Sequence, residues 1–289
     1  MRVAVLVTVH NRVETTVRGL VQFALLVRNL DEFEFTVFLV DDGSTDGTAA
    51  EVRRLPLDID IIDGTGSLYW NRGMILAHQS AVSRGEPFNA YMLYNDDTVL
   101  TETFCDLIKA FRREGNAIVA GAFTDASTGE VNYSGFLRVS RNRPLAFDRP
   151  QLVAGTLVPV DTFNGNLVLL PAEVFDSLGG LDPVFWHAFG DIDLGLRAQK
   201  LGIRSYVFGS PVGYCSRGTS LYDRVRVAGR RERWKLLFGR TAIYGFGQYL
   251  HFVGRHGVLA LLPIYAAREA GRRALMLVPR PPTQSPGRR

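Results

Sequence analysis

Five short apolar runs in the first half of the chain constrain its fold more than any other feature. The runs are Val3 to Val9, Thr36 to Val40, Ile59 to Ile62, Ala90 to Tyr94 and Ile118 to Ala120. Most are separated by segments long enough for a helix. Strands that alternate with helices form a mostly parallel sheet covered on both faces, and such strands are apolar throughout. The sequence therefore predicts an α/β fold with a Rossmann-like sheet.

Turn and capping signals place several further elements. The first helix is predicted to begin near Val13 and the second between Asp46 and Thr48, where DGSTDGT supplies glycines and capping oxygens. Phe163 to Leu170 predicts a strand entered through a polar turn, and the Pro/Arg-rich stretch Arg141 to Pro150 predicts a loop. A helix is expected from close to Gly190 until Gly202, where a glycine can end it.

Composition indicates a globular chain, because 46% of its 289 residues are hydrophobic and 21% are charged. Its two cysteines lie far apart and match no metal-binding spacing, which favours a reducing, cytoplasmic setting. The apolar run Val3 to Val9 ends at a histidine, an asparagine and an arginine, without a long hydrophobic region or a cleavage site. This run is predicted to be a core strand and not a signal peptide.

The net charge of +4 conceals an uneven distribution. Residues 1–216 hold 18 Lys and Arg against 26 Asp and Glu, whereas residues 217–289 hold 15 against 3. We therefore predict a globular domain over 1–216, a basic helical extension over 217–278 and a disordered tail over 279–289.

Polar clusters follow three of the predicted strands: VTVHNR closes the first run, DDGSTD follows the second, and NDD follows the fourth. In sheets of this kind, ligands bind beyond the carboxyl ends of the strands. In the second cluster, Asp42 could accept a hydrogen bond from an imide or amine N–H of a heterocycle. A turn that only caps the next helix would explain this cluster as well.

The stretch YNDDTVL places two carboxylates side by side at the end of an apolar run. An unpaired charge facing a core is costly, so either both carboxylates face water or a positive group lies beside them. Mg²⁺ and Mn²⁺ bind one or two protein carboxylates and complete their shell with phosphate oxygens. We predict that Asp97 reaches such an ion and that Asp96 accepts from a ribose hydroxyl. Capping of the helix expected after Thr101 is the structural alternative.

Two further segments carry candidate residues. GTGSLYWNRGMILAH lacks the third glycine and the acidic residue of a dinucleotide fingerprint, so a nicotinamide site is excluded. Within it, Arg72 faces either a diphosphate or solvent. In GDIDLGLR, Asp193 and Arg197 stand four apart and can pair, which leaves Asp191 as the candidate base at a helix start. Capping of this helix is the structural alternative for Asp191. His187 is either a metal ligand or a residue packed beside its neighbouring tryptophan.

These clusters, in this order, resemble the inverting nucleotide-sugar glycosyltransferases of family 2, which have the GT-A fold and include rhamnosyltransferase-like enzymes of bacterial surface polysaccharides. The resemblance covers about residues 1–216. It is carried by VTVHNR, VDDGSTDGT, WNRGMILAH, by YNDDTVL at the place of the family's DxD motif, and by LGGLDPVFWHAFGDIDLGLRAQKLG at its ED region.

The resemblance implies a role for each matching residue. Asp191 would be the general base, Asp97 the ligand of Mn²⁺ or Mg²⁺, and Asp96 the ribose contact. The other nucleotide-binding positions would be Thr8, His10, Asn11, Asp42 and Arg72. The acceptor-side or secondary positions would be Trp70, Asn166, His187 and Asp193.

Two positions depart from the family pattern. Asn95 stands where the first aspartate of DxD is common, which puts the metal geometry in doubt. Gly190 stands where the glutamate of ED is common, which removes a carboxylate that often orients the acceptor. A nucleotide-sugar-binding module without catalysis therefore stays an alternative. A sugar nucleotidyltransferase is another, although VTVHNRVETT is not the glycine-rich phosphate loop such an enzyme needs.

Donor, acceptor and location are predicted only by class. UDP- and dTDP-sugars share the imide edge that Asp42 would bind, and a guanosine donor is also compatible. A saccharide or a lipid-linked molecule would be the acceptor.

The longest apolar run of the basic end, Val258 to Ala267, has ten residues and contains Pro263, whereas a spanning helix needs about 20. We expect residues 217–278 either to lie on the inner face of the plasma membrane or to pack as a helical subdomain, and we expect no nucleic-acid binding.

Overall fold

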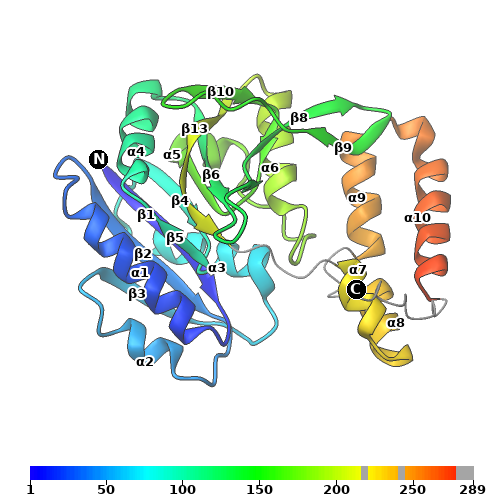
Figure 1. Ribbon diagram of the computed structural model, residues 1–289, viewed down its shortest axis with the longest axis horizontal. Helices are drawn as coiled ribbons and strands as arrows, with labels where there is room; N and C mark the ends of the chain where they lie inside the picture. Colours follow the sequence, from blue (N-terminus) through cyan, green and yellow to red (C-terminus); the bar gives the residue numbers. More distant parts are fainter. Residues whose placement is uncertain (216–220, 240–244, 278–289) are drawn as a thin grey trace, which may run out of the picture. The chain divides into compact units, whose positions relative to one another are not determined.

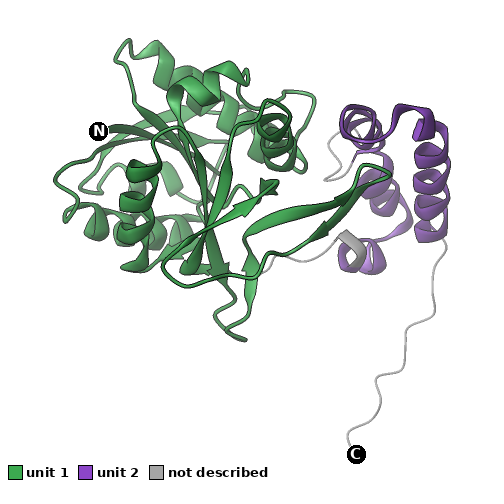
Figure 2. Ribbon diagram, turned by 90° about the horizontal axis from the view of Figure 1, so that it is seen from above, with its two compact units in different colours: residues 1–217 green, residues 218–289 purple. Residues whose placement is uncertain are grey.

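The computed structural model describes residues 1–215, 221–239 and 245–277. The chain divides into two compact units, Met1–Arg217 and Gly218–Arg289, which are coloured separately in Figure 2. The division after Arg217 lies one residue from the predicted boundary between 216 and 217. The roles predicted for the two segments stay predictions. The predicted tail, 279–289, lies outside the described residues.

The first unit is built on a mixed sheet with the strand order β10-β13-β6-β12-β4-β1-β2-β3, in which β5 also pairs with β13 and β7 with β6 (Figure 1). A second sheet has the order β11-β8-β9. The strands are β1 (Arg2–Val9), β2 (Glu34–Asp41), β3 (Asp58–Asp63), β4 (Ala90–Tyr94), β5 (Thr98–Leu100), β6 (Ile118–Thr124), β7 (Val131–Tyr133), β8 (Gly135–Ser140), β9 (Arg143–Asp148), β10 (Leu157–Val160), β11 (Thr162–Phe163), β12 (Leu167–Pro171) and β13 (Ser205–Cys215).

All five predicted apolar runs are strands of this sheet, namely β1, β2, β3, β4 and β6. Strand β1 lies between β2 and β4 and is parallel to both, and β3 is parallel to β2. Strand β12 is antiparallel to both of its neighbours, β4 and β6. Strands β5 and β10 are antiparallel to β13, and β7 is antiparallel to β6. The predicted mostly parallel sheet is confirmed in its central strands, with β12 running antiparallel between β4 and β6.

Helices cover both faces of the sheet in the first unit (Figure 1). Alternate residues of β1 point to opposite faces: Val5 and Val7 pack with residues of α1 and α4, whereas Ala4 and Leu6 pack with residues of α3, α5 and α6. The helices are α1 (Val13–Val27), α2 (Thr48–Val52), α3 (Tyr69–Ser83), α4 (Thr103–Glu114), α5 (Ala172–Ser177) and α6 (Gly190–Lys200). The predicted starts of the first two helices and of the helix at Gly190 are confirmed.

The loop predicted over Arg141–Pro150 is wrong, because it contains strand β9. Ser140 pairs with Arg143 across a tight turn, and Leu137 pairs with Asp148. Strand β9 ends the order of its sheet, so Pro144 lies on an edge strand, where a missing N–H is tolerated.

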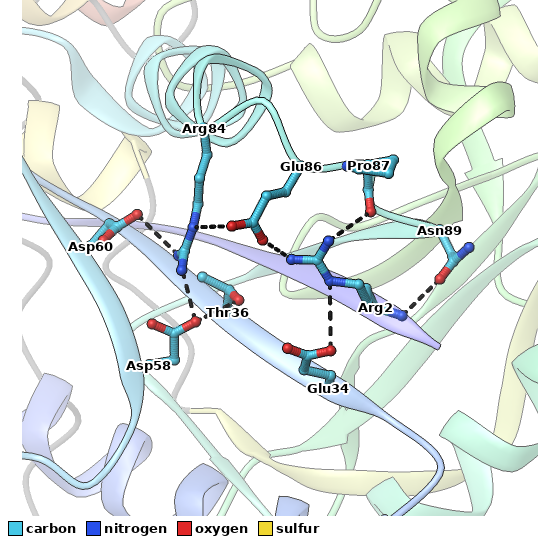
Figure 3. Close-up of polar contacts among 9 residues, drawn as sticks. All are labelled: Arg2, Glu34, Thr36, Asp58, Asp60, Arg84, Glu86, Pro87 and Asn89. Atoms are coloured by element: carbon cyan, nitrogen blue, oxygen red, sulfur yellow. Dashed lines mark hydrogen bonds and ion pairs between the residues drawn. The ribbon is translucent and has the colours of Figure 1, made fainter.

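The amino ends of β1, β2 and β3 are joined by a network of ion pairs (Figure 3). Arg2 lies 3.6 Å from Glu34 and also pairs with Glu86. Arg84 lies 3.5 Å from Asp58 and 3.7 Å from the same Glu86. Exposed pairs of this kind contribute about 0–1 kcal/mol each, so they serve below as control positions.

The second unit consists of short helices around a small core. The helices are α7 (Leu221–Val227), α8 (Arg230–Phe238), α9 (Phe246–His256), the 3₁₀ turn η1 (Leu259–Leu261) and α10 (Leu262–Leu277). Leu237, Phe252 and Val253 are fully buried, as is Arg273, which pairs with Glu269 at 2.7 Å. None of the described helices is long and apolar enough to span a bilayer.

Candidate active site

Asp42 follows β2 directly and anchors the loop that leads into α3. Its carboxylate accepts hydrogen bonds from the backbone N–H groups of Gly66, Leu68 and Tyr69 at 2.7, 2.8 and 3.0 Å. Asp42 is only 5% exposed. A carboxylate has about four acceptor sites, so three bonds leave capacity for one further donor. Asp42 therefore positions the start of α3, and its contact with a nucleobase stays a prediction.

The residues at the end of β1 bind the neighbouring strand ends. His10 donates from Nδ1 to the backbone oxygen of Asp42 at 2.7 Å. Asn11 has a φ of 51°, and its side-chain oxygen accepts from the N–H of Thr45 at 2.8 Å. Thr8 faces α3, since a Cβ placed on Gly73 would lie 2.2 Å from its hydroxyl oxygen. His10 and Asn11 thus fasten β1 to the loop after β2.

A positive group does lie beside the paired carboxylates of YNDDTVL. The guanidinium of Arg12 is 3.2 Å from a carboxylate oxygen of Asp96 and 3.1 Å from one of Asp97. Asp96 also accepts from the hydroxyl of Thr16 at 3.3 Å. Burial raises the pKa of Asp96 to about 6, because the loss of hydration and the charge of Asp97 outweigh the opposing effect of Arg12 and Thr16.

Asp97 is the more exposed of the two, with 35% of its side chain accessible against 8% for Asp96. Its other oxygen lies 3.7 Å from the sulfur of Cys215, which in turn accepts from the side-chain amide of Asn166 at 3.3 Å. Burial raises the pKa of the Cys215 thiol, so the thiol stays neutral beside the carboxylate.

Trp70, in the first turn of α3, links the paired carboxylates to Asp191. Its indole N–H donates to the side-chain oxygen of Asn95 at 2.6 Å. A Cβ placed on Gly165 would lie 2.5 Å from the indole ring and 3.2 Å from the Cβ of Asp191. Gly165 therefore permits the indole and Asp191 to approach each other.

Asp191 lies in the first turn of α6 and is partly exposed. Its two carboxylate oxygens accept from the backbone N–H groups of Gly165 and Ile192, each at 2.8 Å. Burial raises the pKa of Asp191, although these N–H groups oppose the rise. A fixed carboxylate with a raised pKa is a stronger base than an ordinary exposed aspartate.

The space beside Gly190 is filled by the fully buried Asn71. A Cβ on Gly190 would lie 1.8 Å from the side-chain oxygen of Asn71. The side-chain amide of Asn71 donates to the carbonyls of Asp182 and Phe185 at 2.8 and 3.0 Å, which holds the loop before α6. Asn71 of α3 therefore occupies the space that a glutamate side chain at position 190 would need.

Three further predicted site residues lie in α6 or at the loop that precedes it. Arg72 donates to the carbonyl of Pro183 at 3.0 Å and lies 3.5 Å from the centre of the Trp186 ring, so it holds this loop, and its contact with a diphosphate stays a prediction. Asp193 is fully buried and pairs with Arg197 at 2.7 Å. The predicted pairing is confirmed, but burial removes Asp193 from reach of an acceptor. His187 is exposed on the same loop.

Hydrogen bonds and packing contacts connect Asp42, Asp97 and Asp191 through a few intervening residues. Asp42 holds the residue before Trp70, and Trp70 contacts both Asn95 and the backbone beside Asp191. Asn166, the neighbour of Gly165, reaches Asp97 through Cys215. The sequence prediction omitted Arg12, Asn71 and Cys215. Arg12 was identifiable as a candidate, because a positive neighbour was one of the two arrangements expected for the paired carboxylates and VTVHNR supplies an arginine at an adjacent strand end.

Among the described residues, no group of three His, Cys, Asp or Glu side chains is arranged to hold a metal ion. An ion that binds one or two carboxylates and otherwise phosphate and water needs no such group. Asp97 offers partly exposed hard oxygens next to those of Asp96. This donor set fits Mg²⁺ or Mn²⁺ bound together with a diphosphate.

Comparison with known proteins agrees with this geometry. A family model described as glycosyl transferase family 2 matches residues 4–169, and one described as glycosyl transferase family group 2 matches residues 92–279. A comparison with curated proteins gave no match.

Solved structures with a similar fold include several glycosyltransferases. TarS 1-349 of S. aureus has a TM-score of 0.58 and 14% identity, covering 94% of this chain and 89% of that one. Its complex with UDP-GlcNAc has a TM-score of 0.56 at the same identity and coverage. The mannosyltransferase PcManGT from Pyrobaculum calidifontis, in complex with GDP-Man and Mn²⁺, has a TM-score of 0.50 and 18% identity, covering 96% and 80%. At these identities the likeness shows the fold alone.

Proposed function

The chain belongs to glycosyl transferase family 2 and is a glycosyltransferase of the GT-A fold, and from this premise we propose an inverting, metal-dependent reaction. The sugar of a nucleoside-diphosphate sugar would pass to a hydroxyl of a saccharide or lipid-linked acceptor, in the synthesis of a polysaccharide or glycolipid. The observation that carries the proposal is the network that places Asp191 next to Trp70 and, through Asn95, next to the paired carboxylates.

Asp191 is proposed to remove the proton of the acceptor hydroxyl. The hydroxyl oxygen then attacks the anomeric carbon as the bond from that carbon to the diphosphate oxygen breaks, so one displacement inverts the configuration. Two backbone N–H groups fix the carboxylate of Asp191 and leave acceptor sites for the incoming hydroxyl. No covalent intermediate with the protein is required.

The donor is proposed to lie along the carboxyl ends of β1, β2 and β4. Asp42, with Thr8, His10 and Asn11, would border the base, and Asp96 would accept from the ribose. Asp97 would hold Mn²⁺ or Mg²⁺, which when bound would stabilise the negative charge that develops on the diphosphate. Trp70 and Asn166 lie between the donor and acceptor carboxylates and would border the transferred sugar.

The nucleotide is proposed to be UDP or dTDP, since Asp42 would accept from the imide N–H common to both. A UDP-GlcNAc complex of TarS 1-349 supports this choice. The GDP-Man complex of PcManGT is the reason to test GDP-sugars as well. Membership of the family favours transfer of a sugar over synthesis of the nucleotide sugar.

The test is a panel of UDP-, dTDP- and GDP-sugars incubated with the full chain and Mn²⁺, with released nucleoside diphosphate as the readout. We expect slow hydrolysis of at least one uridine or deoxythymidine sugar, and its loss with EDTA. Binding of the nucleotide without any release, even when saccharide acceptors are added, would favour the silent binding module.

We further propose that the second unit binds the anionic inner surface of the plasma membrane. Its described helices expose large apolar side chains, including Trp234 (56%), Leu259 (70%) and Leu275 (68%), among many arginines. Apolar and basic residues together suit the headgroup region of anionic lipids.

Flotation with anionic liposomes tests this membrane proposal. The full chain is expected to float with the vesicles, and the triple variant Arg230→Glu, Arg231→Glu, Trp234→Ala is expected to float at least about tenfold less, because each basic residue contributes about 1 kcal/mol. Arg53→Glu with Arg54→Glu, an exposed pair on the first unit, is the matched control. Equal recovery of the wild type and the triple variant in the floated fraction would end the proposal.

A further inference from the structure

Arg12 bridges the two carboxylates that are proposed to lie at the metal site. One of its nitrogens, Nη1, lies within 3.2 Å of both Asp96 Oδ1 and Asp97 Oδ2. The remaining oxygen of Asp97 is 3.7 Å from the sulfur of Cys215. Both oxygens of the proposed metal ligand are therefore engaged within the chain.

A guanidinium keeps its charge at every physiological pH, so Arg12 is a permanent counter-ion for the two carboxylates. A divalent cation on the same oxygens would lie close to this positive group, and like charges at such separations repel strongly in a partly buried site. Binding of a metal ion to Asp97 thus requires Arg12 to move away.

The side chain of Arg12 is partly exposed, so water can replace the carboxylates as its partner. It is 51% exposed, whereas its partners Asp96 and Asp97 are 8% and 35% exposed. Arg12 is the residue that directly precedes α1. The carboxylates are thus the fixed part of the cluster, and the guanidinium is the part that can leave.

We propose that Arg12 is a placeholder cation, which occupies the two carboxylates until a divalent ion arrives together with a nucleoside diphosphate. The ion alone must displace a bound counter-ion and gains only two protein carboxylates. The diphosphate supplies further oxygen ligands and negative charge, which offset this cost. Metal and nucleotide binding are then coupled, and the coupling is reciprocal. This inference rests on the proposed donor site.

The experiment measures free Mn²⁺ by electron paramagnetic resonance during titration of the folded full chain, with and without UDP. For the wild type we expect weak Mn²⁺ binding without UDP and binding at least about tenfold tighter with saturating UDP, in the usual range of coupling between sites. For Arg12→Gln we expect Mn²⁺ binding without UDP to strengthen about tenfold, so that UDP adds less.

Two further variants serve as controls. Arg12→Lys keeps a positive charge beside the carboxylates and should bind Mn²⁺ without UDP nearly as weakly as the wild type. Arg84→Gln removes a guanidinium from the network at the amino ends of the strands (Figure 3) and should leave both titrations unchanged.

Mn²⁺ affinity without UDP that is unchanged or lower in Arg12→Gln would overturn the inference. The wild type decides the question even if this variant fails to fold, because equal Mn²⁺ affinity with and without bound UDP would also overturn it. Failure of the proposed function gives a different result, namely no UDP binding to the wild type at any Mn²⁺ concentration. The UDP-free titrations of wild type and Arg12→Gln then still test Arg12.

Discussion

Asp191→Asn is expected to lower the rate of sugar transfer by about a hundredfold or more, the effect expected for a lost general base. An amide has no basic oxygen that can take the acceptor proton. Affinity for UDP with Mn²⁺ should stay within about twofold, because the donor is proposed to bind at Asp42, Asp96 and Asp97. The measurement is turnover at saturating donor, together with a nucleotide titration of the same preparation.

The matched control is Asp176→Asn, which removes an exposed carboxylate of α5 that lies beside His78. It should transfer sugar at the wild-type rate. A raised pKa of Asp191 also predicts that wild-type turnover rises with pH above the usual carboxylate range, as this group loses its proton. Unimpaired turnover of Asp191→Asn would rule out its role as the base.

Asp97→Ala is expected to weaken Mn²⁺-dependent binding of a nucleoside diphosphate by at least about tenfold. Loss of an outer-shell partner of a metal typically costs 10–100-fold in affinity, and loss of a direct ligand should cost no less. Calorimetric titration with UDP, with Mn²⁺ and with EDTA, measures the effect. The difference between the two conditions should nearly vanish in the variant.

Asp60→Ala, which removes a partner of Arg84 in the network of Figure 3, is the control for this titration and should behave as the wild type. If Asp97→Ala retained the full Mn²⁺ dependence of UDP binding, Asp97 would not be the metal ligand.

The sequence predicted the elements whose residues signal them locally. The apolar runs became strands because both sides of them are covered, and their order put Asp42 and the paired carboxylates at the same edge of the sheet. The pairing of Asp193 with Arg197 was also predictable, since residues four apart on a helix lie on one face.

Contacts between distant segments could not be predicted. Asn71 and Gly190 are 119 positions apart, and only the structure shows that one occupies the space a side chain of the other would need. Arg72 could not be assigned from its neighbours, because its partners lie in the loop before α6. Strand β9 was missed because the prolines and arginines in and around it are typical of a loop, whereas pairing with β8 decides its conformation.

The arrangement of the donor is tested most directly by the anomalous scattering of manganese in crystals of the full chain grown with UDP and Mn²⁺. We predict one manganese peak at coordination distance, about 2 Å, from the Asp97 carboxylate, with uracil beside Asp42 and the diphosphate between the metal and Asp191. Manganese bound elsewhere, or UDP bound away from the carboxyl ends of β1, β2 and β4, would contradict the proposed site.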